Sequence, residues 1–250
     1  YLKNGDILNK RLTVTFRNEM LSDIIHTAIA CNLSGRGTKD EPYQIGSAND
    51  FTTFLISLAE DDTKCKGIYF KQTKHIKLPA MSTEPVSRFY RGEAFAGHYD
   101  GGGHEVNITC TGKGTDAEDD YAGMFTRLLD GATIDNLTIY AAMSGLRSKG
   151  GALAGSASGH VTISNVNLTG SITNSKSEIG GLIGLVEKGT LQVTNVTFAN
   201  PNSETVEDGF KLLGTQKLGT IVGNAINSTI HINTVSNVNE KGGEEDDDYQ

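Results

Sequence analysis

The chain of 250 residues lacks the features that define several common protein classes. It has no tryptophan and only four prolines. It contains no apolar run of about 18 residues, the length that a membrane-spanning helix needs, so the sequence predicts no membrane span. The formal net charge is −8, and lysine and arginine are dispersed along the chain. This distribution gives no reason to expect nucleic acid or an anionic membrane as a partner.

Cysteine is also scarce. The three cysteines, Cys31, Cys65 and Cys110, show no Cys-x-x-Cys spacing, so they do not predict a zinc site. One disulfide within the N-terminal part and buried free thiols are both compatible with their number. The sequence contains no cofactor motif, and we expect no cofactor.

Glycine, in contrast, is abundant, with thirty residues in a repeating arrangement. Residues 122–238 read as four copies of one unit, in which hydrophobic positions keep register in three columns. The columns are Met124, Leu153, Leu182 and Ile221; Ile134, Ile163, Val193 and Ile232; and Leu137, Val166, Val196 and Val235. A repeat of about 30 residues is typical of a solenoid, because stacked units bury a core that no single unit can bury.

Each unit also contains an alternating segment interrupted by a bend. A flat strand cannot place all the apolar residues of the second unit on one face: Val161, Ile163, Val166 and Leu168. A corner at Asn165, matched by Asn136 and Asn195, removes this conflict, because asparagine tolerates left-handed backbone angles. The sequence therefore predicts an all-β protein, a parallel β-helix (β-solenoid) with stacked corner asparagines and an N-terminal helical cap region. The alternative is a β-sandwich with coincidental glycine spacing.

These repeats resemble a known family. Residues 180–184 (Gly-Gly-Leu-Ile-Gly) and 190–197 resemble the GLUG-type repeat of secreted and surface proteins of gut Bacteroidetes and other bacteria. Residues 37–45 and 95–104 are similar to the usual lead-in of that family. The resemblance implies a β-helix and an adhesin-like protein that is secreted or located at the cell surface. Because the chain begins at Tyr1, we expect that a leader or a larger upstream region could have been removed.

The resemblance also indicates how the chain is divided. We expect one continuous structural domain with an N-terminal cap and first coils (1–121), GLUG-like repeats (122–238), and an acidic tail or linker (239–250). Thr234 in place of the corner asparagine, and a longer spacing before the last unit, imply an atypical terminal coil.

Two helices are expected ahead of the repeats. Asn18 can cap an amphipathic helix, which we expect to cover the first coil. Ser47 opens a second helix, with Asp50 in a relaxed capping box. Its core-facing residues are Phe51, Phe54, Leu55 and Leu58. We expect the first coil strands at 68–70 and 75–78, and an irregular loop at 81–91.

Three segments contain candidate functional residues. Asp100 precedes three glycines and lies between His98 and His104, so it is a candidate catalytic acid or metal ligand, or simply a turn residue that bonds its own backbone. A second candidate is an acidic loop that could bind calcium through its carboxylates or could simply be solvated. Its acids are Asp116, Glu118, Asp119 and Asp120. The lengthened spacing before the last unit predicts a protruding ligand-binding loop, with Asn200, Asn202, Glu204, Glu207, Asp208 and Phe210.

The outward positions of the repeats decide between enzyme and binding protein. A glycosidase needs two carboxylates about 5 to 9.5 Å apart. Asp135 is the single acid among the eight outward positions of the two columns. The columns are Asp135, Ser164, Thr194 and Asn233, and Thr138, Asn167, Thr197 and Ser236. The sequence therefore favours a non-catalytic adhesin-like module that binds a glycan or a surface protein, or acts as a spacer between flanking domains. The alternative is a polysaccharide-degrading enzyme, a glycoside hydrolase or lyase.

Overall fold

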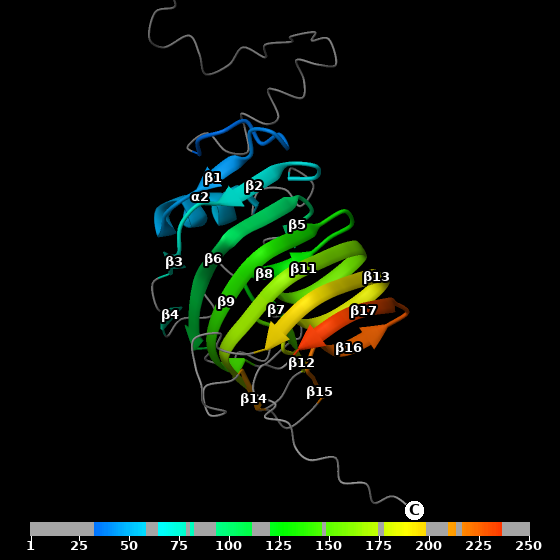
Figure 1. Ribbon diagram of the computed structural model, residues 1–250. Helices are drawn as coiled ribbons and strands as arrows, with labels where there is room; N and C mark the ends of the chain where they lie inside the picture. Colours follow the sequence, from blue (N-terminus) through cyan, green and yellow to red (C-terminus); the bar gives the residue numbers. More distant parts are fainter. Residues whose placement is uncertain are drawn as a thin grey trace, which may run out of the picture.

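The computed structural model describes residues 33–58, 65–78, 81–82, 94–111, 121–146, 149–174, 178–198, 210–213 and 217–236. These residues wind into a parallel β-solenoid of about four turns, with a short helix near the N-terminal end (Figure 1). Among the described residues, no helix is long and apolar enough to cross a membrane. The helix is α2 (Ala48–Leu58), and the strands are β1 (Tyr43–Ile45), β2 (Tyr69–Gln72), β3 (Ile76–Lys77), β4 (Met81–Ser82), β5 (Ala94–Phe95), β6 (His98–Thr111), β7 (Tyr121–Ala122), β8 (Phe125–Leu128), β9 (Thr133–Leu146), β10 (Lys149–Gly150), β11 (Ala154–Asn174), β12 (Ile179–Gly180), β13 (Ile183–Phe198), β14 (Lys211–Leu213), β15 (Leu218–Gly219), β16 (Val222–Ile226) and β17 (Thr229–Ser236).

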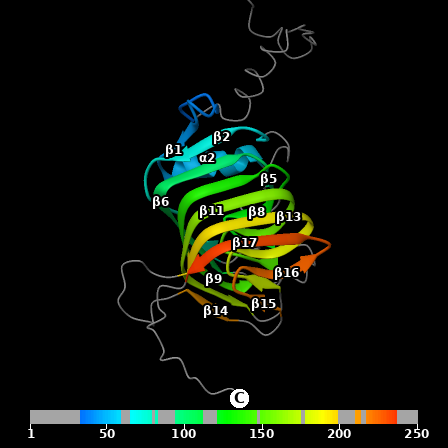
Figure 2. The ribbon, with the colours of Figure 1, turned by 45° about the vertical axis from the view of Figure 1, so that its right-hand side comes forward.

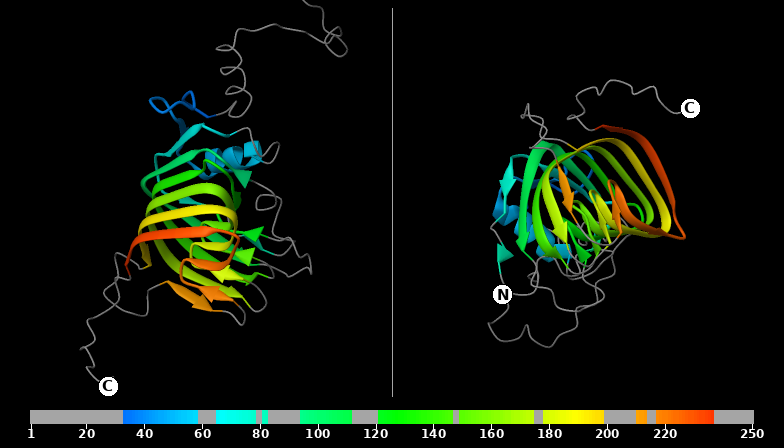
Figure 3. Two further views of the ribbon diagram at one scale, coloured as in Figure 1. Left: turned by 90° about the vertical axis from the view of Figure 1, so that its right-hand side faces the viewer. Right: turned by 90° about the horizontal axis from the view of Figure 1, so that it is seen from below.

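A 13-stranded sheet forms most of the solenoid wall. Its main path runs β1-β2-β6-β9-β11-β13-β16, with β17 also paired to β13, and a 4-stranded sheet runs β15-β12-β10-β7. The long strands pair in parallel, so each coil lies directly on the one before it. Seen from below, these strands curve around the core (Figure 3), and Figure 2 shows them stacked from β1 to β17. The predicted parallel β-helix is therefore confirmed.

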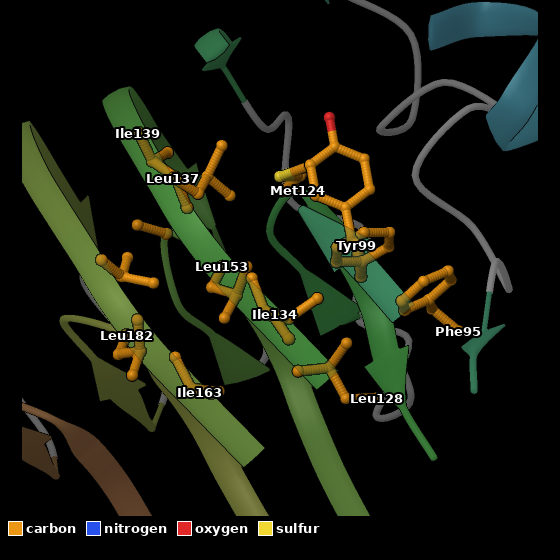
Figure 4. Packing of buried hydrophobic residues seen from close by; sticks show 14 of the residues in the cluster. Phe95, Tyr99, Met124, Leu128, Ile134, Leu137, Ile139, Leu153, Ile163 and Leu182 are labelled. Carbon is orange, nitrogen blue, oxygen red and sulfur yellow. The ribbon is translucent and has the colours of Figure 1, made fainter. Parts of the chain in front are cut away.

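The three predicted hydrophobic columns are also confirmed. Ile163 is in register with Ile134 and with Val193, and Val193 is in register with Ile232. The same three strand pairs align the Leu137 column. In the third column, Leu153 N donates to Leu182 O at 3.1 Å. In the first three units all the column side chains are buried, which is why the sequence repeats them. Figure 4 shows Met124, Leu153 and Leu182 in the same interior as Ile134, Leu137 and Ile163. In the last unit, Ile232 and Val235 keep the register but are exposed.

The asparagine corners lie where the sequence predicts them. Asn136, Asn165 and Asn195 have φ angles of 56°, 53° and 56°, and Thr234 replaces them in the last coil with a φ of 64°. Asn195 Nδ2 donates to Asn165 Oδ1 at 2.7 Å, which is the predicted ladder. Asn165 Nδ2, however, donates to Asp135 Oδ1 at 2.8 Å. The ladder therefore ends on a carboxylate, and this links the repeats to a charged region above them.

Helix α2 closes the N-terminal end of the stack. Asp50 N donates to Ser47 Oγ at 3.1 Å, and Gly46 N donates to Asp50 Oδ2 at 3.0 Å, so the predicted capping box is present. The four predicted core residues of the helix are all buried. Phe54 packs against Phe70 with ring centroids 4.7 Å apart. The helix expected after Asn18 lies outside the described residues, and α2 covers the first coil.

One local prediction needs correction. Met81 and Ser82 were expected in an irregular loop, but they form β4, which pairs with β6 and continues the first coil. The turn predicted at the three glycines after Asp100 is present. It forms a corner within β6, where the register passes from Asp100 directly to His104. Gly102 and Gly103 have φ angles of 60° and 72°, which a glycine adopts without strain.

One cysteine has a described environment. Cys65 is buried in the core, and its sulfur accepts a hydrogen bond from Ala96 N at 3.1 Å. Cys31 and the acidic tail lie outside the described residues.

Candidate functional site

The outward-facing residues of the first coils stack into two polar columns. In one column, Lys71 is in register with Asp100, and Asp100 is in register with Asp135. Ser164 of the repeats continues this column on β11. In the other column, two residues earlier on each strand, Tyr69 is in register with His98, and His98 with Thr133. The charged and aromatic residues therefore gather on β2, β6 and β9.

A groove of about 650 Å³ lies over these two columns. Residues 39–42, before β1, form one side of it, and outward residues of β1, β2, β6 and β9 form its floor. The lining residues are Lys39, Asp40, Pro42, Gln44, Tyr69, Phe70, Lys71, His98, Tyr99, Asp100, Thr133 and Asp135.

A stacked ring pair forms one part of the floor. The Tyr69 and His98 rings have centroids 4.2 Å apart and lie 19° from parallel. His98 Nδ1 is 2.6 Å from Thr133 Oγ1. Partial burial, and secondarily the nearby charge of Lys39, lowers the pKa of His98 from its ordinary value. The lowered pKa favours the neutral form of the His98 ring.

Two carboxylates and a lysine form the other part of the floor. Lys71 Nζ lies 3.4 Å from Asp100 Oδ2, and Gly102 N donates to Asp100 Oδ1 at 2.8 Å. Asp135 Oδ1 accepts hydrogen bonds from Ser164 Oγ at 2.6 Å and from Asn165 Nδ2 at 2.8 Å. These contacts fix the position of each carboxylate on the floor of the groove. The two acids sit on adjacent strands, which are about 4.8 Å apart in a sheet.

The structure separates the predicted His98, Asp100 and His104 set. Asp100 bonds its own turn through Gly102 N, as one prediction had it, and also lines the groove. His98 lies in the groove, but His104 lies beyond the glycine corner, edge-on to His75 with centroids 5.2 Å apart. Among the described residues, no three histidine, cysteine or acidic side chains converge to hold a metal ion. The structure therefore does not bring these three side chains together at one point.

The other candidate residues lie mostly outside the described residues. This applies to the proposed calcium loop, Asp116, Glu118, Asp119 and Asp120, and to Asn200, Asn202, Glu204, Glu207 and Asp208 of the proposed binding loop. Phe210 is described, and its ring packs on Phe198 with centroids 5.7 Å apart. Phe210 is thus partly buried against the core at the edge of its loop.

Sequence reasoning missed Tyr69 and Lys71 as site residues, and it missed that Asp100 and Asp135 are neighbours. The glycine corner hides the alignment: 35 residues separate His98 from Thr133, whereas 30 separate Asn165 from Asn195. Alignment of the outward columns across that insertion is the signal that could have found the groove.

The geometry defines a β-solenoid with a polar groove on its first coils, and comparison with known proteins adds a distant relative. No family model matches the chain, so the expected GLUG-type family is not shown. Over 172 residues, 64% of this chain, the sequence is 28% identical to halomucin of Haloquadratum walsbyi. The match spans 2% of the length of halomucin. A solved structure from Bacteroides ovatus, provisionally described as an immunoglobulin A1 protease, aligns with a TM-score of 0.43 and 15% identity over 80% of this chain and 79% of that one.

Proposed function

We propose that the chain is a non-catalytic, adhesin-like recognition module of a secreted or cell-surface protein, and that it binds a saccharide in the groove over β2, β6 and β9. The observation that carries the proposal is the groove floor, where a stacked Tyr69–His98 pair lies beside Lys71 and two carboxylates. The sequence similarity to halomucin, a protein named as a mucin, supports an extracellular setting.

The chemistry of the floor suits a saccharide. Sugar hydroxyls both donate and accept hydrogen bonds, and the floor offers the acceptors of Asp100 and Asp135 beside the donor of Lys71. The ring pair adds a flat surface beside these polar groups. The strands hold all of these groups, and sites built on strands keep their geometry better than sites on loops. A pocket that combines ring surface with a few placed polar groups is typical of small-ligand sites.

A polysaccharide hydrolase is the second candidate, because Asp100 and Asp135 are in register on adjacent strands. Retaining glycosidases place two carboxyl groups about 5 to 5.5 Å apart, and one of them must be protonated to act as the general acid. In this groove, lysine, hydroxyl, amide and backbone donors already contact both carboxylates. Because these contacts engage both acids, we favour binding without cleavage.

A glycan array and a polysaccharide-digest screen, run in parallel on the purified chain, test this proposal. We expect a saccharide to bind and to remain intact. Tyr69→Ala and Asp135→Asn should each weaken binding about tenfold or more, the effect of losing a central contact. Gln192→Ala is the matched control, since Gln192 is an exposed residue of the His98 column outside the groove.

Two outcomes would contradict the proposal. Cleavage of a polymer that Asp100→Asn abolishes would establish the hydrolase. Failure to bind or cleave any saccharide would leave the spacer function. Far-UV circular dichroism of each variant separates a lost contact from a lost fold.

A further inference from the structure

The floor of the groove contains one carboxylate that no described cation neutralises. Lys71 Nζ lies 3.4 Å from Asp100 Oδ2, and Gly102 N donates to Asp100 Oδ1 at 2.8 Å, so both oxygens of Asp100 have a partner. Asp135, in contrast, forms no ion pair with any described residue. The charge on Asp135 is therefore left for a ligand or for water.

The hydrogen bonds of Asp135 engage one of its two oxygens. Asp135 Oδ1 accepts from Ser164 Oγ at 2.6 Å and from Asn165 Nδ2 at 2.8 Å, and both donors are neutral. Within the described part of the chain, Oδ2 accepts no hydrogen bond. Because Asp135 is exposed and lines the groove, a ligand in the groove can reach this second oxygen.

The repeats hold this carboxylate in place. Asn195 Nδ2 donates to Asn165 Oδ1 at 2.7 Å, and Asn165 Nδ2 donates to Asp135, so the corner ladder ends on the groove floor. The following members of the Asp135 column are neutral: Ser164, Thr194 and Asn233. The column thus changes to an acid where it enters the groove. A side chain fixed in advance in this way loses little freedom when a ligand binds.

The ring pair lies beside the same carboxylate. Thr133 and Asp135 point to the same side of β9 and are two residues apart, about 7 Å along the strand. His98 Nδ1 is 2.6 Å from Thr133 Oγ1, and the His98 ring stacks on Tyr69. Aromatic faces attract cations. The lowered pKa of His98 favours a neutral ring, which does not repel a cation.

We propose that the saccharide of this groove carries a free amino group, and that its ammonium pairs with Asp135 Oδ2 while its ring lies against the Tyr69–His98 pair. This inference rests on the proposed saccharide binding and names the chemical class of the ligand. The groove lining contains two lysines and three aspartates, a net charge of −1 (2 − 3): Lys39, Lys71, Asp40, Asp100 and Asp135.

This charge favours an amino sugar over an acidic sugar. An ammonium has three donors, so it can pair with Asp135 and still bond a neighbouring hydroxyl. In the described groove, Lys71 is already paired with Asp100, so an acidic sugar would depend on Lys39. Asp40, which also lines the groove, follows Lys39 directly in the chain and would oppose the approach of an anion.

Calorimetric titration of the full chain with two matched oligosaccharides tests the inference. The probes are a glucosamine oligomer and the N-acetylglucosamine oligomer of equal length, at about pH 7, where an amine with a pKa of about 8 is mostly protonated. Acetylation removes the charge and keeps the sugar ring. We expect the glucosamine oligomer to bind about tenfold or more tightly, and this preference to shrink at high salt, which screens an exposed ion pair.

Two variants assign the preference to a residue. Asp135→Asn keeps the size of the side chain and an oxygen acceptor, so it should abolish the preference and leave binding of the acetylated oligomer little changed. Glu105→Gln is the matched control, because it makes the same charge change on β6, beyond the glycine corner and outside the groove lining. This variant should keep the preference. Far-UV circular dichroism shows whether each variant is folded.

The possible failures distinguish this inference from the proposed function. Equal or tighter binding of the acetylated oligomer, or a preference that Asp135→Asn retains, would overturn the amino-sugar inference and leave saccharide binding in place. Tighter binding of a galacturonic acid oligomer would do the same and would indicate Lys39 as the contact. If neither glucosamine-based oligomer binds while the glycan array yields an amine-free ligand, the inference also fails. An array without any bound saccharide overturns both.

Discussion

The two ends of the solenoid differ in how the core of the terminal coil is covered. At the N-terminal end, α2 inserts Phe51, Phe54 and Leu58 over the first coil, and each is at most 1% exposed. At the C-terminal end, the column residues Ile232 and Val235 are 53% and 39% exposed, and no described residue covers their coil. A solenoid repeat defines a coil but not its ends. Each end must therefore be covered by a segment outside the repeat. Within the described residues, α2 is such a segment at the N-terminal end, and the C-terminal end has none.

The same comparison explains where the groove lies. The repeats are regular, and their outward columns carry mostly hydroxyl and amide side chains. The first coils are irregular, because the glycine corner in β6 and the loop before β1 depart from the repeat. Of the charged and aromatic outward residues of the groove, Tyr69, Lys71, His98 and Asp100 lie on those coils, and Asp135 lies on the first repeat beside them. Departure from the repeat thus coincides with the most specific surface.

The largest effect is expected when each end loses one side chain. Phe54→Ala leaves a cavity among five rings at the covered end and should cost about 3–5 kcal/mol in the free energy of unfolding. Ile232→Ala at the open end should cost about 1 kcal/mol or less, because half of that side chain is already in water. Urea denaturation of the two variants measures both. Equal losses would contradict the difference between the ends.

The corners provide a second comparison, between the middle and the end of the stack. Asn165→Ala should destabilise the fold by about 1–3 kcal/mol, because alanine is strained at a positive φ and loses both ladder hydrogen bonds. Thr234→Asn should stabilise it by about 1 kcal/mol, since a β-branched residue is more strained than asparagine at a φ of 64°.

Asn165→Gly is the control that divides the two causes in the middle of the stack. Glycine relieves the backbone strain but not the loss of the ladder. If Asn165→Gly is as stable as the wild type, the ladder contributes nothing. If Thr234→Asn melts at a lower temperature than the wild type, the strain assigned to Thr234 is wrong.

Whether a feature could be predicted from the sequence depends on whether it lies within a single repeat. The hydrophobic columns and the corner asparagines were predictable because the same residue types recur at the same position in successive repeats. Even the left-handed position of Thr234, which threonine disfavours, followed from its alignment with Asn195. The groove was not predictable in the same way, because it depends on how Lys71, Asp100 and Asp135 align across coils of unequal length. The role of α2 as the cover also required knowing which of two amphipathic segments lies on the first coil.

The smallest effect concerns pH and the first coils alone. Burial and Lys39 lower the pKa of His98 below its ordinary value of 6.5, so the unfolded chain binds the proton more readily than the folded chain. Stability from this group is present above pH 6.5 and is lost as the pH falls through that value towards the lower folded pKa. Because His98 is only half-buried, we expect a loss of about a few tenths of a kcal/mol, reduced by solvent screening.

Urea midpoints of the wild type and His98→Gln between pH 7.5 and pH 5, at about physiological ionic strength, measure this loss. Glutamine keeps a polar partner near Thr133 and cannot be protonated, so the variant should lose less stability on acidification. The comparison is His231→Gln, which removes a histidine from the same outward column on the last coil. If both variants flatten the pH dependence equally, it does not come from the stacked Tyr69–His98 pair, and the first coils are no more sensitive to pH than the open end.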